Sequence, residues 1–132
     1  MLYGSEIWPM STENERRLKT ADTRMIRMMS GPRLRERHPD RVLMAMSGVE
    51  DITDVARRRR LRWFGHIERK DEEEWVKRIW KEWDVEGTCP RGRPRLTWNK
   101  TVEKECTKLR LDPRDVHDRT AWRKAVGGRH TQ

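Results

Sequence analysis

The strongest fold signal in this chain is the stretch from Asp71 to Trp83, DEEEWVKRIWKEW. Asp71 and Glu74 are spaced as a capping box, the pattern that starts a helix. The large apolar side chains that follow share one helical face: Trp75, Val76, Ile79, Trp80 and Trp83. Burying an aromatic side chain stabilises a fold by roughly 2–3 kcal/mol, so the sequence predicts a helix whose tryptophans fill the core.

Helical spacing continues on both sides of this stretch, and the alternation typical of strands is almost absent. Thr12 and Glu15 form a second capping-box pattern, and Gly31-Pro32 ends the apolar periodicity that follows. Helix starts are expected at or near six residues: Thr12, Asp40, Ile52, Asp71, Thr97 and Asp112. The sequence therefore predicts an all-α fold of about six short helices in one loosely packed domain, with a Pro/Gly/Arg-rich linker between the fourth and fifth helices.

Several helix ends have clear signals. Gly48 follows residues 40–47 in the position of a left-handed helix end. Asp112 precedes a proline at the first helical position, and Gly127-Gly128 ends the last helix before a frayed tail. Inward-facing candidates are Ile52, Val55, Trp63, His66 and Ile67 in the third helix, and Trp98, Val102, Cys106, Leu109, Val116, Ala121, Trp122 and Val126 in the C-terminal helices.

The composition predicts a thin core and an acidic partner. The chain has 132 residues, 40% of them charged, and a formal net charge of +9. Leu, Ile, Val and Phe together supply only 22 residues, the composition of a weakly folded chain, although seven Trp and seven Met offset this scarcity. A sequence pI near 10.2 favours nucleic acid over anionic lipid, because no basic helix with a strongly apolar face stands out.

The sequence excludes several function classes. No apolar run approaches the ~20 residues of a membrane span, and residues 1–5 lack the order of a signal peptide, so we expect an intracellular protein, nuclear or cytoplasmic. The sequence has no phosphate-binding loop and no nucleophile elbow. It also lacks a close Cys or His pair that could hold zinc. Cys106 and His66 are interpreted as core residues, with His66 half-buried, and Cys89 as an exposed thiol.

Five arginines fall within six residues of the third helix: Arg57, Arg58, Arg59, Arg60 and Arg62. Consecutive residues point around a helix, so several of these side chains must face solvent. Guanidinium groups present a fork of donors that fits phosphate. The cluster therefore predicts contacts to a nucleic-acid backbone; the alternative is pairing within the chain to the acidic run Asp71–Glu74.

A second basic segment is PRGRPR, residues 90–95, which carries Arg91, Arg93 and Arg95. Its Arg-Gly-Arg-Pro core resembles an AT-hook, a segment that lies in narrow A·T minor grooves, where arginine is attracted electrostatically. The alternative is a stiff turn between helices with incidental charge. We expect the two basic segments to lie side by side, and six contacts to duplex DNA would give a slope of log K against log salt near −5.

Four ordered blocks carry a resemblance to a known family: LYGSEIW at 2–8, RRRRLRWFGHI at 57–67, PRGRPRLTW at 90–98 and DRTAWR at 118–123. Together they resemble the C-terminal region, thumb and helical extension, of non-LTR (LINE-type) retrotransposon reverse transcriptases. The resemblance implies that residues 1–11 end a polymerase-like segment. It further implies helical regions at 12–84 and 97–132, a basic linker at 85–96, and a role in holding template RNA or target DNA.

The sequence departs from that family in ways that bear on function. It has no aromatic-x-Asp-Asp motif of the polymerase palm, no apurinic-type endonuclease and no C-terminal Cys/His knuckle. We therefore expect a fragment with no enzymatic activity, catalytic residue, cofactor or metal, which binds RNA or DNA without sequence preference. The alternatives are a helical protein-interaction module that self-associates through exposed tryptophans, or a retroelement remnant with no selected role.

Overall fold

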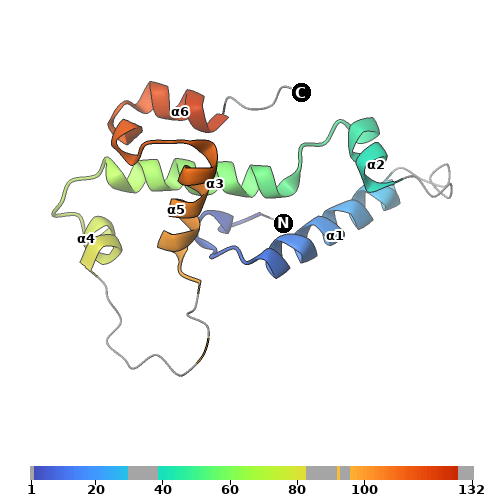
Figure 1. The fold of residues 1–132 in the computed structure, drawn as a ribbon, viewed down its shortest axis with the longest axis horizontal. Helices are drawn as coiled ribbons and strands as arrows, with labels where there is room; N and C mark the ends of the chain where they lie inside the picture. The colour runs from blue at the N-terminus through green and yellow to red at the C-terminus, as the bar shows by residue number, and fades with distance from the viewer. Residues whose placement is uncertain (1, 30–38, 83–91, 93–95, 128–132) are drawn as a thin grey trace.

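Six α-helices make up most of the chain in a computed structural model that describes residues 2–29, 39–82, 92 and 96–127 (Figure 1). They are α1 (Thr12–Met29), α2 (Asp40–Ser47), α3 (Ile52–Glu68), α4 (Trp75–Glu82), α5 (Trp98–Leu109) and α6 (Arg119–Gly127), with short 3-10 helices at η1 (Ser5–Ile7) and η3 (Pro113–His117). Within these described ranges no strand is present, which confirms the predicted all-α fold. The predicted linker falls almost entirely outside them.

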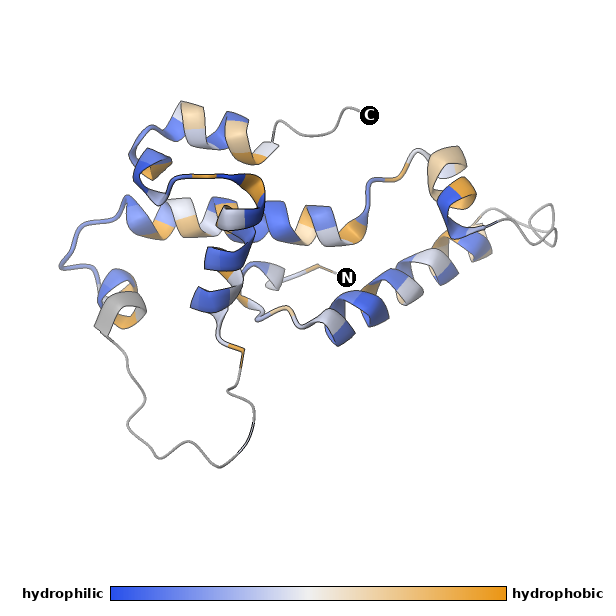
Figure 2. Cartoon of the chain, in the orientation of Figure 1, coloured by the Kyte–Doolittle hydropathy of each residue, from blue (hydrophilic) through white to orange (hydrophobic). Residues whose placement is uncertain are grey.

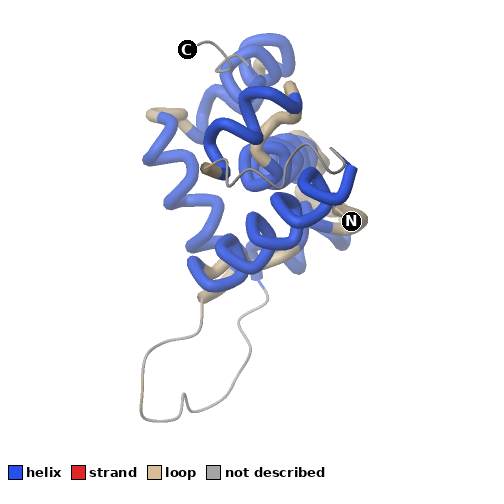
Figure 3. Tube along the Cα trace, turned by 90° about the vertical axis from the view of Figure 1, so that its right-hand side faces the viewer, coloured by secondary structure: helices blue, strands red, loops and turns tan. Residues whose placement is uncertain are grey.

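The other elements are arranged around α3. Figure 1 shows α6 lying along one side of α3, α5 crossing it, and α4 beyond its C-terminal end. The 3-10 helix η1 packs against α3, while α1 and α2 extend past its N-terminal end. The visible face of α1 is largely hydrophilic in Figure 2. A view turned by 90° shows helices joined by loops and turns, with no strand among the described residues (Figure 3). The core therefore lies between α3, α5 and α6.

A small apolar cluster holds these three helices together. Its buried members are Leu61, Phe64, Val102, Cys106, Val116, Trp122 and Val126, with Trp98, Leu109 and Leu111 packed against them. The sequence placed most of these C-terminal residues correctly. Trp122 is 2% exposed, and its indole Nε1 donates a hydrogen bond to the Leu61 carbonyl at 3.0 Å. A Cβ at Gly65 would lie 2.5 Å from that nitrogen, so the indole packs where α3 has no side chain.

Trp75 and Ile79, two residues of the apolar stripe that was predicted to fill the core, are exposed on α4. Trp75 is 71% exposed and Ile79 is 41% exposed, whereas Lys77 is only 5% exposed. The Lys77 ammonium donates to the carbonyls of Glu68 and Lys70, at 2.9 and 2.8 Å. A cation is favoured at the carbonyl end of a helix, so Lys77 attaches α4 to α3 through a polar cap. Trp83 and the Trp80 side chain lie outside the described residues.

Two predicted helix caps are also corrected. The cap of α1 is Ser11 rather than Thr12, because the Ser11 hydroxyl accepts from the Asn14 amide at 3.2 Å. The helix α4 begins at Trp75, after a turn in which the Asp71 carbonyl accepts from the Glu74 amide.

Other end signals are confirmed. Gly48 has a left-handed φ of 63°, and the Asp112 carboxylate accepts from the Arg114 amide at 2.9 Å. That cap opens η3, and Asp118 then caps α6 through the amides of Thr120 and Ala121.

Candidate nucleic-acid interface

The helical period divides the arginine cluster of α3 between two faces. The inward face is formed by buried residues: Ala56, Arg60, Leu61, Phe64 and Ile67. The outward face carries residues spaced i, i+3, i+4 and i+7: Arg59, Arg62, Trp63 and His66. Arg57 and Arg58 lie at the border and are partly buried. The five predicted phosphate-binding arginines are therefore not equivalent.

Arg60 was predicted to contact phosphate, but it is 1% exposed and forms an ion pair with Glu105 of α5. It occupies a core position because the apolar stripe of α3 passes through residue 60. Burial raises the pKa of Glu105 to about 7, even though Arg60 and Arg57 act to lower it. Within the described residues, Arg60 Nε and Nη2 and Glu105 Oε2 are buried without a hydrogen-bond partner. Arg60 therefore has a structural position.

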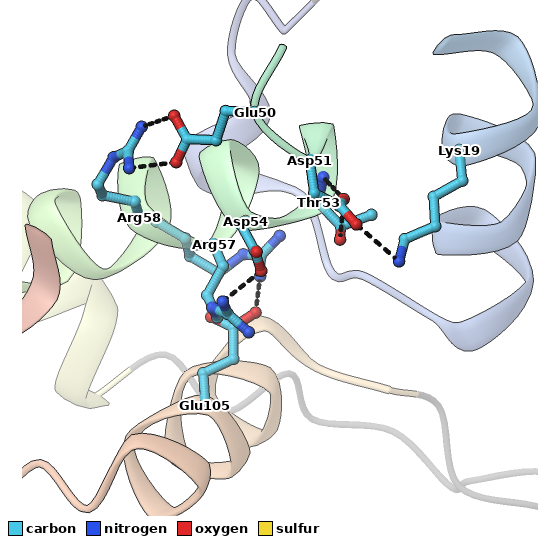
Figure 4. A network of polar contacts seen from close by, with 9 residues as sticks. Lys19, Glu50, Asp51, Thr53, Asp54, Arg57, Arg58 and Glu105 are labelled. Carbon is cyan, nitrogen blue, oxygen red and sulfur yellow. Dashed lines mark hydrogen bonds and ion pairs between the residues drawn. The ribbon is translucent and has the colours of Figure 1, made fainter. Parts of the chain in front are cut away.

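Arg57 and Arg58 are also paired with carboxylates, as Figure 4 shows. Arg57 forms an ion pair with Asp54 on the same helix. Both terminal nitrogens of Arg58 donate to Glu50, one of them at 2.6 Å, and this contact raises the pKa of Arg58. Pairing within the chain therefore occurs, as the alternative interpretation held, but with carboxylates that the sequence did not indicate.

The acidic run 71–74 pairs with lysines instead. Glu74 contacts Lys70 at 2.5 Å, and Glu72 contacts Lys77 at 2.8 Å.

Arg59, Arg62, Trp63 and His66 form the candidate interface. With Glu6 of η1 they line a shallow, open hollow of about 400 Å³. Arg59, Arg62 and His66 are exposed, and Trp63 is half-buried. The ring centroids of Trp63 and His66 are 5.4 Å apart, with the planes tilted by 32°. Arg59 Nη1 donates to the Leu2 carbonyl at 2.9 Å, which connects the interface to the N-terminal segment.

His66 was predicted to be half-buried in the core, and this is wrong: it is exposed on the outward face. Trp63 and His66 were interpreted only as packing residues, although their spacing from Arg59 and Arg62 places all four on one helical face. That spacing was the available signal. It was missed because apolar and aromatic residues at helical spacing were all assigned to the core.

A larger groove of about 1010 Å³ lies between α1, α3 and α5. Three lysines of α5 that the sequence analysis overlooked line it at four-residue spacing: Lys100, Lys104 and Lys108. Among the residues that the structure describes, six cationic side chains and five carboxylic side chains line the groove. By this count the groove has the same net charge as the hollow on α3, where two arginines face one glutamate. Two cations of the groove, Arg57 and Arg60, are paired with carboxylates, so the groove is the weaker candidate for binding a polyanion.

Other predicted residues have mixed outcomes. Arg91, Arg93, Arg95 and Cys89 lie outside the described residues. Cys106 is buried as predicted, and burial together with the nearby Glu105 raises the pKa of its thiol to about 11.

Across the described ranges, no three His, Cys, Asp or Glu side chains are grouped so as to hold a metal ion. No helix in the same ranges combines the length and the apolar character needed to cross a membrane.

The described part of the chain is thus a small all-α, basic protein with a mixed basic and aromatic face on its central helix. The sequence is 28% identical over 118 residues to an uncharacterized transposon-derived protein of Caenorhabditis elegans. The alignment covers 85% of this chain and 42% of the relative, so the chain spans about two-fifths of that protein's length. This similarity indicates a transposon-related origin. No protein-family model and no solved structure matches the sequence.

Proposed function

We propose that this chain derives from the C-terminal region of a non-LTR retrotransposon reverse transcriptase. We propose further that it acts as a non-catalytic module that binds RNA or DNA without sequence preference. The four sequence blocks and the transposon-derived relative support the origin. The binding role is supported by the net charge of +9 and by the candidate interface.

One observation carries the binding proposal: Arg59 and Arg62 remain exposed on α3 beside an aromatic pair, while the neighbouring arginines are paired with carboxylates. Exposed guanidinium groups neutralise phosphates and release condensed counterions, so binding weakens as salt rises. We assign the remaining phosphate contacts to the basic linker: Arg91, Arg93 and Arg95. Five arginines then contact the nucleic-acid backbone, rather than the six contacts expected from the sequence.

The test is the affinity for duplex DNA and for single-stranded RNA, measured by fluorescence anisotropy at several salt concentrations. Five phosphate contacts give a slope of log K against log salt of about −4.5 on duplex DNA. The triple variant R91A/R93A/R95A should reduce this slope to about −2, because about two contacts remain. A wild-type slope much shallower than −2 would contradict the proposal.

A charge-matched control is available on α1. Arg16 and Arg17 are exposed and both pair with Glu13, at 3.0 and 2.9 Å. The variant R16Q/R17Q removes two positive charges from α1, whereas R59Q/R62Q removes two positive charges from the candidate interface on α3. Only the second should lower affinity and flatten the slope. Equal losses would mean that net charge, rather than the interface, determines binding.

A second candidate function is protein interaction through α4. Trp75 and Ile79 expose apolar surface on this helix, and Val76 beside them is only partly buried. Such a surface favours association with a protein or with a second copy of the chain. The substitution Trp75→Ser should abolish self-association in sedimentation experiments while R91A/R93A/R95A leaves it intact. A chain that stays monomeric at high concentration would contradict this candidate.

A further inference from the structure

The hollow on α3 combines two kinds of binding group within one helical face. Arg59 and Arg62 stand one turn apart, with Trp63 beside them and His66 one turn further on. The hollow is open to solvent, and an aromatic ring lines it. Its walls can therefore receive a flat group while the guanidinium groups at the edge hold an anion.

The backbone that carries Trp63 is anchored by the core. The next residues of α3, Phe64 and Gly65, are both buried, and Phe64 packs against Trp122 with ring centroids 6.0 Å apart. This packing anchors the backbone that carries Trp63. The ring also contacts His66, whose centroid lies 5.4 Å away. The anchored backbone and the contact with His66 both reduce the conformational freedom that Trp63 would lose when another flat group stacks on it.

Resting on the proposed nucleic-acid function, we infer that the hollow binds a base of single-stranded nucleic acid. The base stacks on Trp63, next to His66, and Arg59 and Arg62 contact the phosphates that flank it. Stacking on an aromatic side chain tolerates any base, because every base has a π-face. Bases in a duplex are stacked on one another, so the hollow distinguishes single strands from duplexes.

Glu6 provides an independent charge test. Of the described residues that line the hollow, it alone has a carboxylic side chain. Its negative charge opposes a phosphate that approaches Arg59 or Arg62. Removing that charge with Glu6→Gln should strengthen binding of a single strand if the strand enters the hollow. It should change nothing if the strand binds elsewhere.

The experiment compares three probes of equal length and charge per strand: a mixed-sequence single-stranded DNA, its duplex, and an abasic single strand. Trp63→Leu should weaken binding of the first probe by about fivefold or more, the loss of one stacked base. Affinity for the duplex and for the abasic strand should stay unchanged, as should the salt slope. Trp63→Phe, which keeps a ring, should retain most of the affinity, and circular dichroism checks that each variant folds.

The outcomes separate this inference from the function on which it rests. If R59Q/R62Q weakens binding of all probes but Trp63→Leu weakens none, the chain binds nucleic acid without a stacking site, and the inference is wrong. If wild-type protein binds none of the probes at low salt, the proposed function itself fails. If Trp63→Leu does not fold, His66→Ala and Glu6→Gln decide: unchanged single-strand affinity in both would overturn the inference.

Discussion

The buried pair between Arg60 and Glu105 should determine much of the stability of this small fold. Arg60 is 1% exposed, and its side chain is a guanidinium group with five N–H donors and no acceptor. The Glu105 side chain is 12% exposed and supplies the acceptor. Glu105→Leu would leave a buried guanidinium without that acceptor, a loss of about 3–5 kcal/mol. For a chain of this size, this loss lowers Tm by about 10–20 °C.

A double-mutant cycle on Arg60 and Glu105, together with Glu105→Gln, separates the effect of the buried charges from that of the hydrogen bond. Glu105→Gln keeps an oxygen for Arg60 and should cost less than about 1.5 kcal/mol. Arg60→Met is milder than Glu105→Leu, because a carboxyl group can take up a proton whereas a guanidinium group cannot lose one. In the double variant R60M/E105L no charged side chain remains at these two positions. Its stability should be within about 1 kcal/mol of wild type, since the native pair already leaves polar atoms unpartnered.

Urea and thermal unfolding followed by far-UV circular dichroism, at a pH above 7.5 where Glu105 is ionised, would measure these differences. We expect a large favourable coupling between Arg60→Met and Glu105→Leu. A loss of less than about 1 kcal/mol for Glu105→Leu, or additive losses in the double variant, would refute it. Either result would mean that solvent reaches the Arg60 guanidinium.

Three further predictions concern the same core. The pKa of Glu105 is raised from 4.5 to about 7, so between these pH values the native state holds a proton that the unfolded state loses. The stability of the wild type relative to Glu105→Gln should therefore fall by up to about 3 kcal/mol between pH 4.5 and 7. A stability difference that does not change with pH would contradict this. In urea unfolding, Trp122→Ala should lower the free energy of unfolding by about 3–5 kcal/mol, and Trp75→Ala, at an exposed position, by less than about 0.5 kcal/mol. Equal losses would mean that Trp75 of α4 belongs to the core. Gly65→Ala should destabilise by about 1–3 kcal/mol despite its better helix propensity, because the new methyl group displaces the Trp122 indole; unchanged Tm and near-UV circular dichroism would count against that packing.

The sequence predicted the helices well because their ends have local causes. Gly48 adopts the left-handed conformation that its position required, and Asp112 caps the turn that follows it. The apolar spacing of the C-terminal helices identified Val102 and Trp122 correctly as core residues. Local rules of this kind depend only on neighbouring residues, so they can be applied without knowing the fold.

The parts that failed depend on contacts between distant residues. Periodicity shows that the tryptophans of α4 share a face, but not whether another element covers that face, and Trp75 is left exposed. Likewise, charge alone indicated that Arg60 is solvated. Its burial depends on Glu105, which is supplied 45 residues later by α5. Lys77 is buried for the same kind of reason, because its ammonium caps the end of α3.

Ultraviolet cross-linking followed by mass spectrometry would show which residues of the chain contact nucleic acid. Trypsin cleaves after Arg62 and Arg69, so it releases residues 63–69, a peptide that contains Trp63 and His66. With a single-stranded oligonucleotide bound to the wild-type chain, we expect cross-linked nucleotide on this peptide. In R59Q/R62Q, where trypsin no longer cleaves after residue 62 and releases residues 61–69 instead, we expect no cross-link on that longer peptide. Cross-links confined to residues 71–77, which carry Trp75, or absent from residues 63–69 altogether, would contradict the assignment of nucleic-acid binding to the outward face of α3.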